Sequence, residues 1–189
     1  MHKLVTAFSL TFLILFLTAC VGGGKPVPDP SITSFTSSAA TITAGSSVDL
    51  TAIFTDGAGV IDNTVGGVTT NVAISVTPAS TTTYTLTITN TAGVAITETL
   101  TVTVVPAPTI TSFVASAATI TSGSSVDLTA IFTDGAGVID NTVGGVTTNV
   151  AISVTPASTT TYTLTITNTA GTAVTSTVTV TVVPPPTIT

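Results

Sequence analysis

The sequence predicts an all-β protein, made of two tandem β-sandwich domains that follow an N-terminal signal peptide. First, apolar and polar residues alternate with a period of two in several short runs, and no stretch of either repeat shows helical apolar spacing over three turns. Second, residues 30–105 recur as residues 108–183, at an offset of 78 positions and with eight differences in 76. One type of domain is therefore present twice.

The first 19 residues are typical of a secretory signal peptide. A charged start is followed by an apolar run at 4–19, shorter than the roughly 20 residues that a membrane-spanning helix needs. The run ends in LTAC at 17–20, and Cys20 is the only cysteine of the chain. We expect the signal peptide over 1–19 and a tether rich in glycine and proline over 20–29.

The LTAC motif resembles the lipobox of bacterial lipoproteins. The resemblance implies that Cys20 takes a diacylglyceryl group and becomes the acylated N-terminus, which anchors the chain to a membrane. Two or three acyl chains give stable anchoring where one would be marginal. Val21, in place of the aspartate of inner-membrane lipoproteins, favours the outer membrane or cell surface of the bacterial envelope. The alternative is an ordinary cleaved signal peptide, in which Cys20 has no role.

Each repeat contains about seven short strand candidates. At 48–54, for example, Val, Leu, Ala and Phe alternate with Asp, Thr and Ile, as half-buried antiparallel strands require. Turn-forming residues, Gly66-Gly67 among them, separate the runs. The expected strands of the first repeat are 32–35 with 41–43, 48–54, 60–61, 68–69, 72–76, 83–89 and 94–104. So many strands in so short a repeat predict a two-sheet sandwich.

Three segments resemble the immunoglobulin-like repeats of bacterial surface proteins. They are TITSF at 109–113, GSSVDLTA at 45–52 and PASTTTYTLTITN at 78–90. The resemblance implies two tandem immunoglobulin-like β-sandwich domains. It also implies that Tyr84, two residues before the core residue Leu86, forms a tyrosine corner, with Tyr162 as its equivalent. Because the chain has no tryptophan and no cysteine pair, the order of the strands stays open.

Proline-rich segments delimit the repeats. We expect the first domain over 30–105, a linker at 106–108 and the second domain over 109–183. Proline fixes φ and biases the preceding residue to extended conformations, so these segments should be short, semi-rigid spacers. Residues 184–189 match the beginning of the second repeat, which predicts the start of a truncated third repeat from a longer array.

The charged residues exclude several functions. Without the signal peptide, Lys25 is the only basic side chain and faces eight acidic ones, so the chain cannot neutralise phosphates and we expect no nucleic-acid partner. No histidine remains to activate a serine or threonine as a nucleophile. We therefore expect no enzyme activity and no catalytic residues.

The segment FTDGAGVIDNTVGG occurs at 54–67 and again at 132–145. Its aspartates are candidate calcium ligands, since Ca²⁺ binds six to eight oxygens. These candidates are Asp56, Asp62, Asp134 and Asp140. The favoured alternative is a pair of turns, because Asp, Asn and Gly are the residues that turns select. In that interpretation the protein binds no metal and no cofactor.

The function that these features favour is a lipid-anchored protein of the bacterial cell envelope whose repeats act as a stalk or spacer. The alternative is an adhesive module that binds an envelope or extracellular protein, or a carbohydrate, with or without calcium. Adhesive sites are rich in exposed aromatic residues and arginine. The chain has no arginine, and Phe35, Phe54 and Tyr84 are all core candidates, so the spacer is favoured. A third interpretation is an accessory domain of an enzyme.

Overall fold

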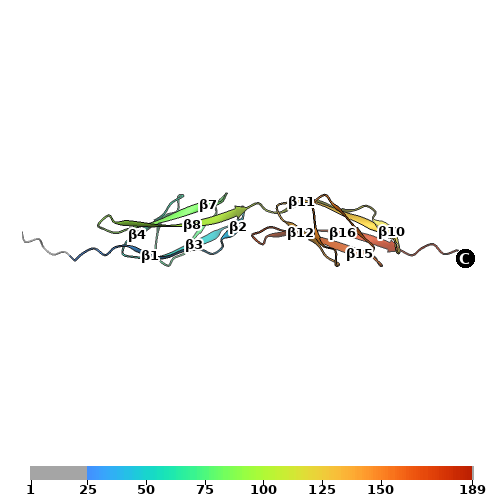
Figure 1. Cartoon of the computed structure of the whole chain (residues 1–189), viewed down its shortest axis with the longest axis horizontal. Helices are drawn as coiled ribbons and strands as arrows, with labels where there is room; N and C mark the ends of the chain where they lie inside the picture. Colours follow the sequence, from blue (N-terminus) through green and yellow to red (C-terminus); the bar gives the residue numbers. More distant parts are fainter. Residues whose placement is uncertain (1–24, 189) are drawn as a thin grey trace, which may run out of the picture.

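In the computed structural model, which describes residues 25–188, the chain forms two β-sandwich domains that lie end to end (Figure 1). Cys20 and the signal peptide at 1–19 lie outside the described residues. The strands of the first domain are β1 (Ser31–Ser37), β2 (Thr41–Thr43), β3 (Val48–Thr55), β4 (Ala58–Ile61), β5 (Gly66–Val68), β6 (Ile74–Val76), β7 (Thr82–Thr89) and β8 (Ala95–Val105). Those of the second are β9 (Thr109–Ala115), β10 (Thr119–Thr121), β11 (Val126–Thr133), β12 (Ala136–Ile139), β13 (Gly144–Val146), β14 (Ala151–Val154), β15 (Thr160–Thr167) and β16 (Ala173–Val183).

Each domain consists of a three-stranded and a five-stranded sheet. In the first domain their strand orders are β1-β3-β6 and β2-β8-β7-β4-β5, and the second domain repeats them as β9-β11-β14 and β10-β16-β15-β12-β13. All pairs are antiparallel except β2 with β8 and β10 with β16, which are parallel. No helix of the described residues has the length and apolar character that crossing a membrane requires.

The alternation of apolar and polar residues in the sequence correctly predicts which residues form the core. In β3 the residues at 48, 50, 52 and 54 are buried, and those at 49, 53 and 55 are exposed. The three aromatic residues Phe35, Phe54 and Tyr84 are all buried in the core of the first domain, as predicted. Leu86 lies at the centre of this core with none of its side chain exposed. The second domain has the equivalent core.

Three details of the strand prediction are wrong. Residues 32–35 and 41–43 belong to different sheets, because β1 pairs with β3 whereas β2 pairs with β8. Gly66 and Gly67 do not break the chain but belong to β5, where they pair with β4. The strand expected at 72–76 begins at Ile74, after a turn in which Asn71 has a φ of 60°.

Candidate functional site

Asp56 lies in the turn that carries the chain from β3 to β4, and so from one sheet to the other. Its φ of 59° lies in the left-handed region, which Asp and Asn tolerate better than most residues. Its exposed carboxylate accepts a hydrogen bond of 2.9 Å from the Thr55 hydroxyl. Asp134 has the same φ and accepts a hydrogen bond of 2.7 Å from Thr133. Both aspartates are therefore turn residues.

Asp62 begins the turn between β4 and β5. Its Oδ1 accepts hydrogen bonds from the backbone N–H of Thr85 at 2.8 Å and from Nδ2 of Asn63 at 2.9 Å. The turn residues Asn63 and Thr64 have φ values of 53° and 68°, as in the type I′ turns of β-hairpins. Asp140 makes the same contacts in the second domain. The carboxylate therefore fastens this turn to the neighbouring strand.

The structure does not bring the calcium candidates together. Asp56 precedes β4 and Asp62 follows it, and the four residues of this strand span about 13 Å. Two oxygens bound to one Ca²⁺ lie within about 5 Å of each other, because each is 2.3–2.6 Å from the ion. Asp134 and Asp140 are separated by β12 in the same way. No group of three acidic, histidine or cysteine side chains that could hold a metal ion occurs among residues 25–188.

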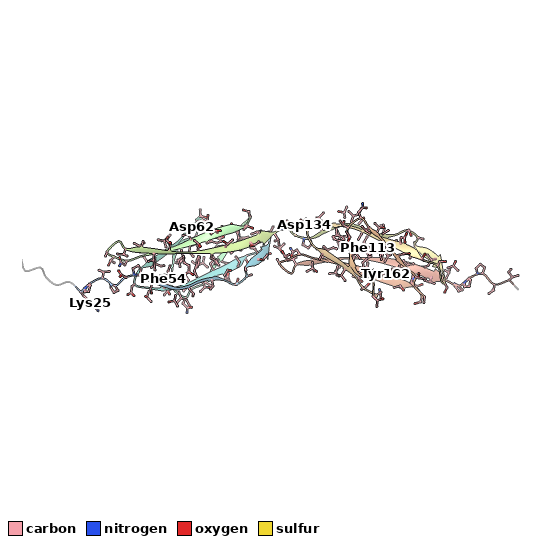
Figure 2. The ribbon with its side chains drawn as sticks, viewed as in Figure 1. Lys25, Phe54, Asp62, Phe113, Asp134 and Tyr162 are labelled. Carbon is pink, nitrogen blue, oxygen red and sulfur yellow. The ribbon has the colours of Figure 1, made fainter. Side chains whose placement is uncertain are left out.

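Asp134 has a different position in the molecule from its equivalent in the first domain. It lies at the end of the second domain that faces the first (Figure 2). It lines a hollow there together with Val105. Asp56 lines the corresponding hollow at the opposite end of the first domain, together with Val27 and Pro28 of the tether. The second repeat thus meets a folded domain where the first meets the tether.

Tyr84 lies near the start of β7 and is buried with Leu86, as the resemblance to a tyrosine corner implies. Just upstream, the carbonyl of Ser80 accepts a hydrogen bond of 2.7 Å from the Thr82 hydroxyl. The hydrogen bond from the Tyr84 hydroxyl that would complete the corner stays a prediction, as does that of Tyr162.

An open hollow lies beside each of these tyrosines. It has a volume of about 470 Å³ in the first domain and about 490 Å³ in the second. In the first domain it runs between the β4–β5 turn and β6, and its lining includes Asn63, Val65, Ser75, Pro78 and Tyr84. No charged side chain lines either hollow. Because ligand sites combine an apolar cleft with well-placed polar groups, an open hollow of this kind offers little to fix a ligand.

From the two buried tyrosines we predict that the folded protein becomes less stable at alkaline pH. Burial raises the pKa of Tyr84 and of Tyr162 above 10.0, and the negative charges of Asp62 and Asp140 raise it further. Above pH 10 the unfolded chain therefore loses phenolic protons that the folded chain keeps, which favours unfolding. The stabilisation should be fully present below pH 10 and be lost as the pH rises through the folded pKa values.

Denaturant unfolding of the full chain between pH 8 and pH 12 measures this loss. The double variant Tyr84→Phe and Tyr162→Phe keeps both rings, so we expect its midpoint to fall less above pH 10 than that of the parent chain. Equal pH dependence of the two proteins would contradict an alkaline loss carried by these hydroxyls.

Two asparagines that the sequence prediction did not single out hold the proline segments to the domains. Asn90 Nδ2 donates a hydrogen bond of 2.8 Å to the carbonyl of Pro28 in the tether. Asn168 Nδ2 donates one of 2.9 Å to the carbonyl of Pro106 in the linker. Both asparagines are buried. The sequence Asn-Thr-Ala-Gly around each asparagine indicates a turn but not its hydrogen bond to a proline carbonyl, because that carbonyl lies 62 residues earlier in the chain.

Comparisons with known proteins identify the fold. No protein-family model and no curated protein matches the sequence. Among solved structures, an I-band fragment of titin is similar with a TM-score of 0.53 and 14% identity, over 85% of this chain and 68% of that one. A C-terminal fragment of intimin, solved in complex with the intimin-binding domain of the translocated intimin receptor, is similar with a TM-score of 0.52 and 16% identity, over 78% of this chain and 63% of that one.

Extracellular domains 3–5 of Drosophila OTK are similar with a TM-score of 0.52 and 16% identity, over 82% of this chain and 62% of that one. The chain spans less than two thirds of the length of the intimin and OTK structures. At these identities the likeness shows the fold alone. The chain folds as two tandem immunoglobulin-like β-sandwich domains.

Proposed function

We propose that this chain is a lipid-anchored protein of the bacterial cell envelope whose two immunoglobulin-like domains act as a stalk. The end-to-end arrangement of the domains carries the proposal: the tether at Lys25 and the C-terminal segment lie at opposite ends of the molecule (Figures 1 and 2). The eleven residues of β8 span about 36 Å, so two domains in line span on the order of 70–80 Å. A group at the C-terminal end would be held at that distance from an anchor at Cys20.

The surface of the domains supports a spacer over a gripping module. The large apolar side chains exposed among the described residues are valines and isoleucines, with no aromatic residue among them. They include Ile53, Val60, Val72 and Val94 of the first domain and Val27 of the tether. Aromatic residues and arginine dominate the energetics of binding surfaces. The aromatic residues of both domains are buried in their cores instead.

The tether supports anchoring close to the first domain. Pro28 is hydrogen-bonded to Asn90, and Pro30 is buried against the domain. Pro28 follows Cys20 by only eight positions in the sequence. With acyl chains on Cys20, the first domain would therefore begin near the bilayer surface.

Metabolic labelling tests the anchor. In bacterial cells that produce the full chain, radioactive palmitate should label the protein, and the protein should partition into detergent. In the Cys20→Ser variant the label and the partitioning should both be lost, because the sulfur that takes the diacylglyceryl group is gone. Equal labelling of the two proteins, or no labelling of the parent, would refute the lipid anchor.

A measurement of height tests the stalk. The lipidated chain in a supported bilayer, with a fluorophore at its C-terminus, should hold that fluorophore on the order of 70–80 Å above the surface. A variant without the second domain, residues 109–183, should hold it at about half that height. Equal heights for the two chains would refute the spacer even if the anchor were confirmed.

A further inference from the structure

The two domains are joined by a polar contact around Asn168, in the turn between β15 and β16. Its Nδ2 donates to the Thr43 hydroxyl of the first domain at 3.0 Å and to the carbonyl of Pro106 at 2.9 Å. Its Oδ1 accepts the backbone N–H groups of Ala170 at 3.1 Å and Thr172 at 3.0 Å, which shapes the turn. An amide side chain has two donors and two acceptor positions, so Asn168 is fully satisfied, and it is only 7% exposed.

A second hydrogen bond crosses the same junction. The hydroxyls of Thr43 and Thr172 lie 2.6 Å apart, although the two residues are 129 positions apart in the sequence. Thr43 ends β2 and is 6% exposed. Thr43, Asn168 and Thr172 together form what we call the clasp. A tilt that kept the junction covered would leave this hydroxyl and this amide buried without their partners, so tilting the domains would be costly.

The turn at the other end of the first domain has the same shape but lacks the clasp hydroxyl. Asn90 Oδ1 accepts the backbone N–H groups of Ala92 at 3.0 Å and Val94 at 2.9 Å, and its Nδ2 donates to Pro28. Val94 stands where the second domain has Thr172, and it is 44% exposed. One of the eight differences between the repeats is therefore a hydroxyl, present where the turn meets a folded domain and absent where it meets the tether.

The far end of the second domain presents the same acceptors that the first domain uses. Thr121 ends β10 as Thr43 ends β2, and Pro184 follows β16 as Pro106 follows β8. Thr121 is more exposed than Thr43, and its side chain has no hydrogen-bond partner among residues 25–188. A hollow of about 580 Å³, lined in part by Val183 and Pro184, lies at this end.

We propose that this end of the second domain is a docking face for a further immunoglobulin-like repeat, joined through the proline segment that begins at Pro184. The incoming turn would have the form Asn-x-x-x-Thr, as at 168–172. Its carboxamide would donate to the Thr121 hydroxyl and the Pro184 carbonyl, and its threonine would bond to Thr121. The end of the first domain with Val94 lacks the matching hydroxyl, so it cannot form the threonine–threonine hydrogen bond of the clasp with another domain.

This inference rests on the proposed stalk, and it explains why neighbouring domains of the stalk keep one relative orientation. Inter-domain contacts within a chain usually allow the domains to move relative to each other. A clasp whose buried donors and acceptors are all satisfied selects one orientation, and a docking face that repeats it transmits the orientation along an array. The length of such a stalk would then be set by the number of repeats.

Spin-label distance measurements test the clasp in the full chain carrying Cys20→Ser. Labels on Asp49→Cys and Asp127→Cys, equivalent exposed positions of the two domains, should give a narrow distance distribution. Thr43→Val should widen it at least about twofold, because the clasp loses its hydroxyl and the domains regain their relative motion. The matched variant Thr121→Val alters the same position of the second domain and should leave it unchanged. An unchanged width with Thr43→Val would overturn the proposal.

A chain extended after Pro186 by one further copy of residues 109–183 tests the docking face. With Thr121 intact, labels in the second and third domains should give a distribution as narrow as that of the first pair. It should widen with Thr121→Val, and also when the threonine of the third turn is replaced by the valine of position 94. A broad distribution with Thr121 intact would overturn the docking face. Loss of palmitate labelling, by contrast, would refute the lipid anchor and leave the docking face standing.

Discussion

Leu86→Ala should destabilise the first domain alone, lowering its free energy of unfolding by about 2–5 kcal/mol. None of the Leu86 side chain is exposed, and it lies in the strand that links both halves of the five-stranded sheet. The change removes buried methyl groups and leaves a cavity that the surrounding sheets can close only in part. Small domains are stable by only about 5–15 kcal/mol, so the loss would be a large share of the total.

Denaturant unfolding of the full chain measures this effect. The two cores are equivalent, so the parent chain should unfold over one narrow range of denaturant, whereas Leu86→Ala should split the curve into two transitions. Leu164→Ala should split it in the same way by weakening the second domain. Ile53→Ala, at a site 39% exposed, is the control and should shift the curve much less. A single transition that moved as a whole would show that the two domains do not unfold independently.

The sequence pattern is sufficient to predict the parts of the fold that depend on local alternation. In β3 and β7 every second residue is apolar, and these residues are the buried ones. Phe54 and Tyr84 occupy such apolar positions, so this part of the core follows from the period of two. Phe35 lies in β1, where a bulge between Ile32 and Ser34 interrupts the alternation. The duplication then transfers the whole prediction to the second domain without new evidence.

Pairing between distant strands could not be predicted in this way. Residues 41–43 form a parallel pair with the end of β8, about 60 positions later in the sequence, and nothing in their own pattern distinguishes this pair from a continuation of β1. Gly66 and Gly67 belong to a strand because β4 supplies their hydrogen-bond partners, although glycine weakens strands on average. In both cases tertiary contacts override the local preference.

The clasp could not be predicted from the sequence either, because it joins residues that are far apart in the chain. One feature of the sequence nevertheless points to it. Asn168 and Thr43 are 125 positions apart, and each looks like an ordinary residue of a turn or a strand end. The two repeats are almost identical, but Val94 of the first is replaced by Thr172 in the second. The other four residues of this turn, Asn-Thr-Ala-Gly, are the same in both repeats. At this position the difference between the repeats coincides with a difference in their surroundings, because Thr172 meets the first domain.

Gly57→Ala should destabilise the first domain by about 1–3 kcal/mol, although the residue is exposed and lies in a turn. A Cβ at this position would lie 2.6 Å from Cγ2 of Ile88 and 2.9 Å from the carbonyl oxygen of Thr89. The Ile88 side chain is buried and the Thr89 backbone belongs to β7, so neither can withdraw without disturbing the sheet. The turn would have to lift away from the strand instead.

Gly67→Ala is the matched control, because a Cβ there would meet only the carbonyl of Gly59, at 4.0 Å. It should be neutral or stabilise slightly, since alanine restricts the unfolded chain more than glycine does. Denaturant unfolding of both variants distinguishes two explanations for the repeated glycines: a ligand site, or the close approach of the turn to β7. If the glycines served a ligand, Gly57→Ala would leave stability unchanged. A loss of stability in Gly57→Ala but not in Gly67→Ala, with and without calcium, would show that the first glycine is there for the close approach of the turn to β7.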